Sequence, residues 1–112
     1  QYTAARIKSV LRKGGKGGSY EIKEINEDEY KLVSLLSTFP DVVKAAAEKL
    51  EPFFITRYAI DVASAFNKFY FDHKIIGEDE NTTNFRLAIC SSALTVITSA
   101  LTLLGIKVPE RM

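Results

Sequence analysis

Tryptophan is absent from this 112-residue sequence, and cysteine, methionine and histidine occur once each. The single cysteine, Cys90, cannot form an internal disulfide. Its apolar neighbours Leu87, Ile89 and Leu94 predict a buried small side chain rather than a nucleophile or a metal ligand. His73 has no second histidine or cysteine at helical spacing, so neither a metal site nor a serine hydrolase is expected. The sequence therefore predicts no catalytic residues and no metal.

Long apolar runs are missing as well. No stretch approaches the roughly 18 apolar residues of a membrane-spanning helix, and the opening QYTAARIKSV lacks the order of a signal peptide, so we expect a cytoplasmic protein. A hydrophobic content of 46% with a mean hydropathy of −0.01 is typical of one globular domain, residues 1–112. Because the chain opens on Gln1 directly in a helical pattern, we expect it to be a fragment of a larger protein.

Charge is distributed unevenly although the net charge is only +1. Residues 1–23 carry a net charge of +5, and the rest of the chain carries −4. A basic segment beside an acidic body indicates contact with a polyanion, because Lys and Arg neutralise phosphates and release counterions. A solvated helix face explains the same pattern. The basic residues of this segment are Arg6, Lys8, Arg12, Lys13, Lys16 and Lys23.

The spacing of apolar residues predicts an all-α bundle of about five helices without a sheet. The first covers 1–13, and the glycine-rich stretch 14–18 opens a flexible loop over 14–26. That loop lacks the GxxxxGK[ST] order of a phosphate-binding loop. Asn26 and Asp28 are suitable caps for a helix over 27–38, and Pro40 suits the first turn of a helix over 40–50. Pro52 precedes a fourth, aromatic helix.

The fifth helix is expected over about 82–104, after the turn at Gly77 and before Gly105. Its many β-branched residues oppose a helix, because they lose rotamer freedom there. A stretch of this length without Pro or Gly is nevertheless too long for a strand, and its apolar residues do not alternate. The apolar stripes of the fourth and fifth helices predict that the following residues are buried: Val62, Phe66, Phe69, Ile89, Val96 and Leu104.

Aromatic and cationic residues remain as candidates for a binding surface. Unpaired RNA bases stack on aromatic or guanidinium planes, while Lys and Arg contact phosphates. For Tyr2 and Tyr70, packing in the core explains the pattern equally well. His73, near the end of the fourth helix, is expected to meet solvent or a helix carboxyl terminus. The binding candidates are Tyr2, Arg6, Asn67, Lys68, Tyr70 and Arg86.

Five segments in order resemble the C-terminal, DALR-type anticodon-binding domain of arginyl-tRNA synthetases. They are QYTAARIKSVLRK at the start, AFNKFY at 65–70, IIGEDE at 75–80, FRLAI at 85–89 and LTLLGIKVPERM at the end. The resemblance implies a helical bundle that holds the anticodon stem and loop of an arginine-specific tRNA. It also implies a parent enzyme, an arginine-tRNA ligase, whose catalytic domain binds ATP and arginine. The HIGH and KMSK-type signatures of that domain are absent here, so no cofactor is expected in this domain.

The resemblance further implies that the tRNA contacts are made by Tyr2, Arg6, Tyr70 and Met112. Met112 is then expected to lie ordered against the bundle. Lys74 stands where some relatives have a bulky aromatic residue, which weakens the case for stacking at that position. A structural or protein-interaction bundle remains an alternative to RNA binding. A relative that serves another amino acid is opposed by the closing Pro109-Glu110-Arg111-Met112.

Overall fold

The computed structural model describes residues 2–15 and 17–105, which form a bundle of five helices. These are α1 (Tyr2–Gly14), α2 (Glu27–Ser37), α3 (Phe39–Lys49), α4 (Phe53–Asp72) and α5 (Glu80–Leu103). No strand occurs in the described residues. The predicted all-α class and the five helices are confirmed, with boundaries shifted by a few residues at most.

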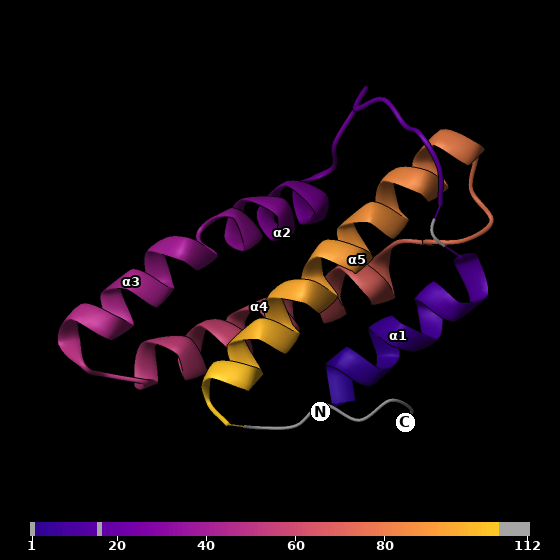
Figure 1. Cartoon of the computed structure of the whole chain (residues 1–112). Coiled ribbons are helices and arrows are strands. Elements are labelled where there is room, and N and C mark those ends of the chain that lie inside the picture. The colour runs from indigo at the N-terminus through magenta and orange to yellow at the C-terminus, as the bar shows by residue number, and fades with distance from the viewer. Residues whose placement is uncertain (1, 16, 106–112) are drawn as a thin grey trace.

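The two longest helices, α4 and α5, lie against each other in the middle of the bundle (Figure 1). α1 packs mainly on α5, and α2 and α3 pack mainly on α4. The core between them includes Ile7 from α1, Leu32 from α2, Val62 and Phe66 from α4, and Ile97 from α5. All of these side chains are almost completely buried. This shared core fixes the position of the first residues of α1 relative to the last residues of α4.

Local signals determine where the helices begin. Asn26 is the N-cap of α2: its side chain accepts a hydrogen bond from the backbone N–H of Glu29, whose carboxylate accepts one from the Asn26 N–H. Pro40 lies in the first turn of α3, as predicted. Asp79 caps α5 by accepting from the Thr82 N–H. Hydrogen bonds from the Thr82 side chain and then from its backbone N–H lower the pKa of the Asp79 carboxyl.

Four of the six residues predicted to be buried are confirmed, namely Val62, Phe66, Phe69 and Ile89. The other two predictions are wrong, because Val96 and Leu104 are only partly buried. The buried face of α5 combines large and small residues, and Val96 and Leu104 pack at its edge. It consists of Phe85, Leu87, Ile89, Cys90, Ala93, Ile97, Ala100 and Leu101. By length and composition α5 could cross a membrane, but this face makes it a core helix.

The segment before α2 is neither helix nor strand over residues 17–26, whereas Gly14, which was predicted to open the loop, still belongs to α1. Two asparagine side chains of α5 form hydrogen bonds with the backbone of this segment. Asn81 accepts from the Glu21 N–H at 2.6 Å and donates to the Glu21 carbonyl at 2.9 Å, and Asn84 donates to the Ser19 carbonyl at 3.0 Å. The Tyr20 ring lies 5.4 Å from the Phe85 ring. The segment is therefore anchored to the start of α5.

Candidate nucleic-acid interface

A cluster of five side chains forms where the first turns of α1 meet the end of α4. We call it the Arg6 cluster. On α1, residues four apart share one helix face, and on α4 residues three and four apart do the same. The packing of the two helices then brings the two faces together across 61 positions of sequence. The members of the Arg6 cluster are Tyr2, Arg6, Asn67, Tyr70 and Phe71.

The guanidinium of Arg6 is the centre of this cluster. Its Nη1 donates to Asn67 Oδ1 at 3.0 Å, and its Nη2 donates to Tyr2 Oη at 2.7 Å. Its Cζ lies 4.6 Å from the centroid of the Tyr2 ring and 4.9 Å from the centroids of both Tyr70 and Phe71. Distances below about 6 Å allow attraction between a cation and an aromatic ring. Arg6 is thus fixed by two hydrogen bonds and three rings.

The rings of the cluster differ in how much of them meets solvent. Tyr2 is 59% exposed and Phe71 is 69% exposed. Tyr70 is half-buried, because its ring also stacks on the fully buried Phe66 at 6.2 Å. Tyr70 therefore packs partly in the core on one side and contacts Arg6 on another, while its role in RNA binding stays a prediction. The cluster presents aromatic surface that is already held in place.

Three of the four residues implied by the resemblance, Tyr2, Arg6 and Tyr70, come together in this cluster. Met112 lies outside the described residues. Phe71 was not predicted. The sequence nevertheless contains a signal for it. Phe71 is a large apolar residue next to Tyr70, but it lies off the buried stripe of α4, so packing in the core does not explain it.

Basic side chains lie next to the cluster. Lys13 of α1 and Lys74, which follows α4, line a shallow pocket of 270 Å³ together with Tyr70 and His73. Lys74 therefore lies where it can contact a phosphate, although it cannot stack as an aromatic residue would.

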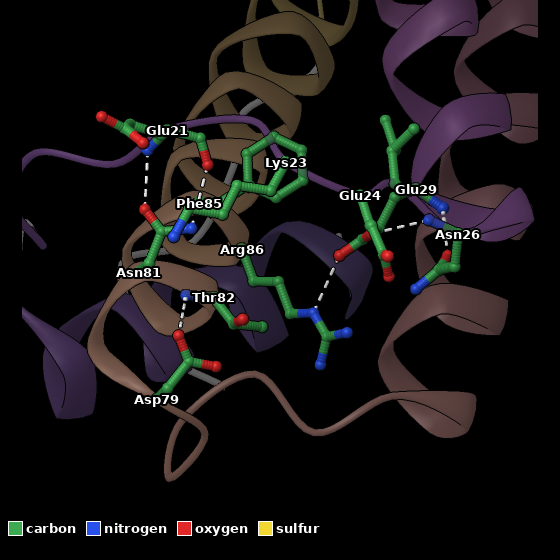
Figure 2. A pocket seen from close by; sticks show the side chains of 11 residues that line it. Glu21, Lys23, Glu24, Asn26, Glu29, Asp79, Asn81, Thr82, Phe85 and Arg86 are labelled. Atoms are coloured by element: carbon green, nitrogen blue, oxygen red, sulfur yellow. Dashed lines mark hydrogen bonds and ion pairs between the residues drawn. The ribbon is translucent and has the colours of Figure 1, made fainter.

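Arg86, which was also a binding candidate, lies outside the Arg6 cluster, and its side chain is mostly buried. Its Nε donates to Glu29 Oε2 at 2.8 Å, and its Nη1 donates to the Lys74 carbonyl at 2.5 Å. The side chains of Arg86 and Glu29 are only 12% and 4% exposed. Figure 2 shows Arg86 directed toward Glu29. Both residues line a pocket between the segment before α2 and the start of α5, with a volume of 510 Å³. Arg86 thus joins α2 and α5 through a buried ion pair.

Lys68 and His73 are also held by carboxylates. Lys68 Nζ lies 2.5 Å from Asp72 Oδ2 and 3.8 Å from Asp28 Oδ2. The hydrogen bond to Asp72, followed by the charge of Asp28, raises the pKa of Lys68. His73 was expected to meet solvent or a helix carboxyl terminus, but it contacts the amino end of α2, where its Nε2 lies 2.8 Å from Asp28 Oδ2. These contacts fasten the end of α4 to the start of α2.

Among the described residues, no group of three or more His, Cys, Asp or Glu could hold a metal ion. The described carboxylates with close partners form ion pairs or helix caps. The surface that stands out is the Arg6 cluster with its neighbouring cations.

Cys90 provides a test of how tightly the core is packed. It is fully buried, and burial raises the pKa of its thiol to about 12. The thiolate is the reactive form, so at pH 8 the folded protein is expected to react with iodoacetamide only when it opens. Mass spectrometry over time should show slow labelling that becomes rapid in denaturant. Fast labelling without denaturant would contradict this packing of Cys90.

Comparison with known proteins gives a consistent result. The family described as the DALR anticodon binding domain matches residues 1–112. The chain is 40% identical over 119 residues to an arginine–tRNA ligase of Halothermothrix orenii and 43% identical over 115 residues to one of Clostridium botulinum. All of this chain is covered, but only 20% of each relative. The solved arginyl-tRNA synthetase of Thermus thermophilus superposes with a TM-score of 0.93 at 30% identity, over 99% of this chain and 20% of that protein.

Proposed function

The chain belongs to the DALR anticodon-binding domain family, and from this membership we propose that it binds the anticodon stem and loop of an arginine-specific tRNA. The chain spans about a fifth of the length of the relatives it matches. We therefore place it within a larger arginine-tRNA ligase, a cytoplasmic enzyme that joins arginine to its tRNA with ATP. The remainder of that enzyme, including the catalytic domain that binds ATP and arginine, is the intramolecular partner of this domain.

The observation that carries the proposal is the exposed aromatic surface around Arg6. Bases in an anticodon loop are unpaired, so their faces can stack on protein rings and their edges can form hydrogen bonds. Tyr2, Tyr70 and Phe71 provide ring surface, and Arg6 and Asn67 provide polar atoms within the same cluster. Such a surface suits single-stranded nucleotides better than a duplex, whose bases are stacked on each other.

Electrostatics support the same partner. Residues 1–23 carry a net charge of +5, and they include the whole of α1. Lys13 and Lys74 lie beside Tyr70, so a loop whose base stacks on the cluster would bring its phosphates near these cations. A bundle that only contacts other proteins does not require rings and cations in this arrangement. In this proposal the aromatic rings bind the bases of the loop, and the lysines bind its phosphates.

The middle base of the anticodon is the recognition feature that we propose for this site. Arginine codons all carry G at the middle position, so the middle anticodon base is C in every arginine-specific tRNA. A single pocket that binds this base would therefore serve all of these tRNAs. Tyr70, with Arg6 at 4.9 Å from its ring, offers both a stacking surface and a nearby donor group.

Substitution of Tyr70 tests this function. In the complete ligase, Tyr70→Ala is expected to weaken tRNA binding by about 5- to 150-fold, because stacking of one base on an aromatic ring contributes roughly 1–3 kcal/mol. Tyr70→Phe keeps the ring and should bind nearly as well. The affinity is measured by tRNA titration at fixed salt concentration, since phosphate contacts depend strongly on salt.

A melting curve of each variant separates recognition from folding, because Tyr70 also contacts Phe66 in the core. Tyr30 is a matched control: it is a tyrosine on α2, 63% exposed and outside the Arg6 cluster, and Tyr30→Ala should leave affinity unchanged. If a folded Tyr70→Ala protein binds tRNA as tightly as the wild type, Tyr70 does not belong to the interface.

A further inference from the structure

The geometry points to Phe71 as a second stacking platform, which holds an unpaired base of the same loop next to the base held at Tyr70. This inference rests on the proposed function and deepens it. It assigns an RNA contact to a residue that neither the sequence pattern nor the resemblance had indicated. Its basis is the juxtaposition of the exposed Phe71 ring with the fixed guanidinium of Arg6, 4.9 Å from its centroid.

Phe71 is not part of the hydrophobic core. Its neighbours along the buried stripe of α4, Phe66 and Phe69, are completely buried, whereas Phe71 is 69% exposed. An isolated exposed apolar residue would need no explanation. Phe71 is not isolated, however. The Tyr70 ring lies 5.4 Å away at an interplanar angle of 79°, and Arg6 Cζ lies 4.9 Å from the centroid of the Phe71 ring. The ring is held in place and still meets solvent.

Pre-organisation makes this ring suitable for binding. Arg6 is itself fixed by hydrogen bonds to Asn67 and Tyr2, so its contact with Phe71 restrains the ring before any ligand arrives. Ordering a mobile side chain on binding costs conformational entropy, and a ring that is already restrained avoids part of that cost. A base that stacks on Phe71 would also remove exposed apolar surface from water. Both effects favour occupancy by a planar ligand.

The chemistry of Phe71 defines what it can bind. A phenyl ring has no hydrogen-bonding group, so it stacks on the face of any base and cannot distinguish base edges. Asn67, Arg6 and Tyr70 carry the polar atoms of the cluster. We therefore assign affinity to Phe71 and base discrimination to its polar neighbours. Replacing Phe71 should weaken binding of cognate loops by the same factor whichever base stacks there.

Another residue of α4 provides a matched control. Phe53 is 59% exposed and lies at the opposite end of the helix, about 27 Å away at 1.5 Å rise per residue. Among the described residues it has neither an aromatic nor a cationic partner. Phe53→Ala removes the same side chain from the same kind of exposed position. It should leave tRNA affinity unchanged.

The experiment titrates the complete protein with an arginine-specific tRNA transcript that carries 2-aminopurine at one anticodon-loop position at a time. Phe71→Ala is expected to weaken binding by about 5- to 150-fold, the equivalent of one lost base stack. Phe71→Tyr should bind like the wild type, and Phe71→Leu, which is apolar but not aromatic, should bind like Phe71→Ala. At saturating protein, the quenching of 2-aminopurine should be lost at one loop position in Phe71→Ala and retained at the others.

Several results would overturn the inference. Wild-type affinity in a folded Phe71→Ala or Phe71→Leu protein would exclude a stacking platform and leave the proposed function intact. Equal loss of quenching at every loop position would show that Phe71 only holds Arg6 in place. If the wild-type protein does not bind the transcript at all, the proposed function fails, and this inference fails with it.

Discussion

Replacement of Glu29 by Ala is expected to lower the free energy of unfolding by about 3–5 kcal/mol, the cost of removing one partner from a buried ion pair. The Arg86 side chain would remain with 12% exposure and without its carboxylate at 2.8 Å. The same substitution removes the acceptor for the Asn26 N–H at the start of α2. Urea unfolding followed by circular dichroism measures the loss.

Glu27 is the matched control for this experiment. It lies in the same first turn of α2 and pairs with Lys31 at 2.9 Å, but the side chains of Lys31 and Glu27 are 64% and 78% exposed. Exposed ion pairs contribute little, so Glu27→Ala should cost less than about 1 kcal/mol. Equal effects of the two substitutions would show that burial of the Glu29–Arg86 pair does not determine its contribution.

Replacement of Arg6 by Ala is expected to weaken tRNA binding by about 30-fold or more. Arg6 contacts both exposed rings, Tyr2 and Phe71, and its loss would release them together. Two stacks worth roughly 1–3 kcal/mol each give at least about 2 kcal/mol, which corresponds to about 30-fold in the dissociation constant. The measurement is the same tRNA titration at fixed salt, with a melting curve to confirm that the variant is folded.

Two further variants identify the origin of this effect. Arg6→Lys keeps the positive charge but lacks the planar fork that contacts Asn67 and Tyr2, so it should recover little affinity. Arg57→Ala removes one positive charge elsewhere on the surface, where Arg57 pairs with Asp61 at 3.5 Å. If Arg57→Ala and Arg6→Ala weaken binding equally, net charge rather than the Arg6 cluster accounts for the loss.

Helix positions were predictable because their signals are local. Asn26 and Pro40 each act within one turn of the chain, so the sequence indicates the starts of α2 and α3 without knowledge of the fold. Asp28 was also named as a cap, but it lies in the first turn of α2 and contacts His73, 45 positions away. An acidic residue at the start of a helix can cap that helix or pair with a neighbouring helix. Only the packing of α2 on α4 shows that Asp28 does the second.

The buried face of α5 was harder to predict for a similar reason. Val96 and Leu104 fit a helical stripe but are only partly buried, whereas Ala93 and Ile97, which were not predicted, are almost completely buried. The helical period alone allows more than one apolar stripe on α5. The packing of α1 and α4 against α5 decides which stripe is buried, and that choice does not follow from the α5 sequence alone.

The Arg6 cluster shows the same limit. Tyr2, Arg6 and Tyr70 could be named from the family resemblance, whereas Phe71 could not, because it contacts a guanidinium that comes from another helix. Arg86 was misassigned for the opposite reason: a cation at the start of a helix resembles a phosphate ligand until its buried partner Glu29 is known. Contacts between residues distant in sequence decided both cases.

The attachment of the segment before α2 has a consequence for how this region can diverge. Asn81 and Asn84 contact only main-chain atoms of Glu21 and Ser19, and every residue type other than proline offers those same atoms. These hydrogen bonds are therefore indifferent to the side chains of Ser19 and Glu21. Substitutions can accumulate at these two positions while α5 keeps its hold on the chain, whereas Tyr20, which packs on Phe85, and Asn26, which caps α2, are constrained by their side chains.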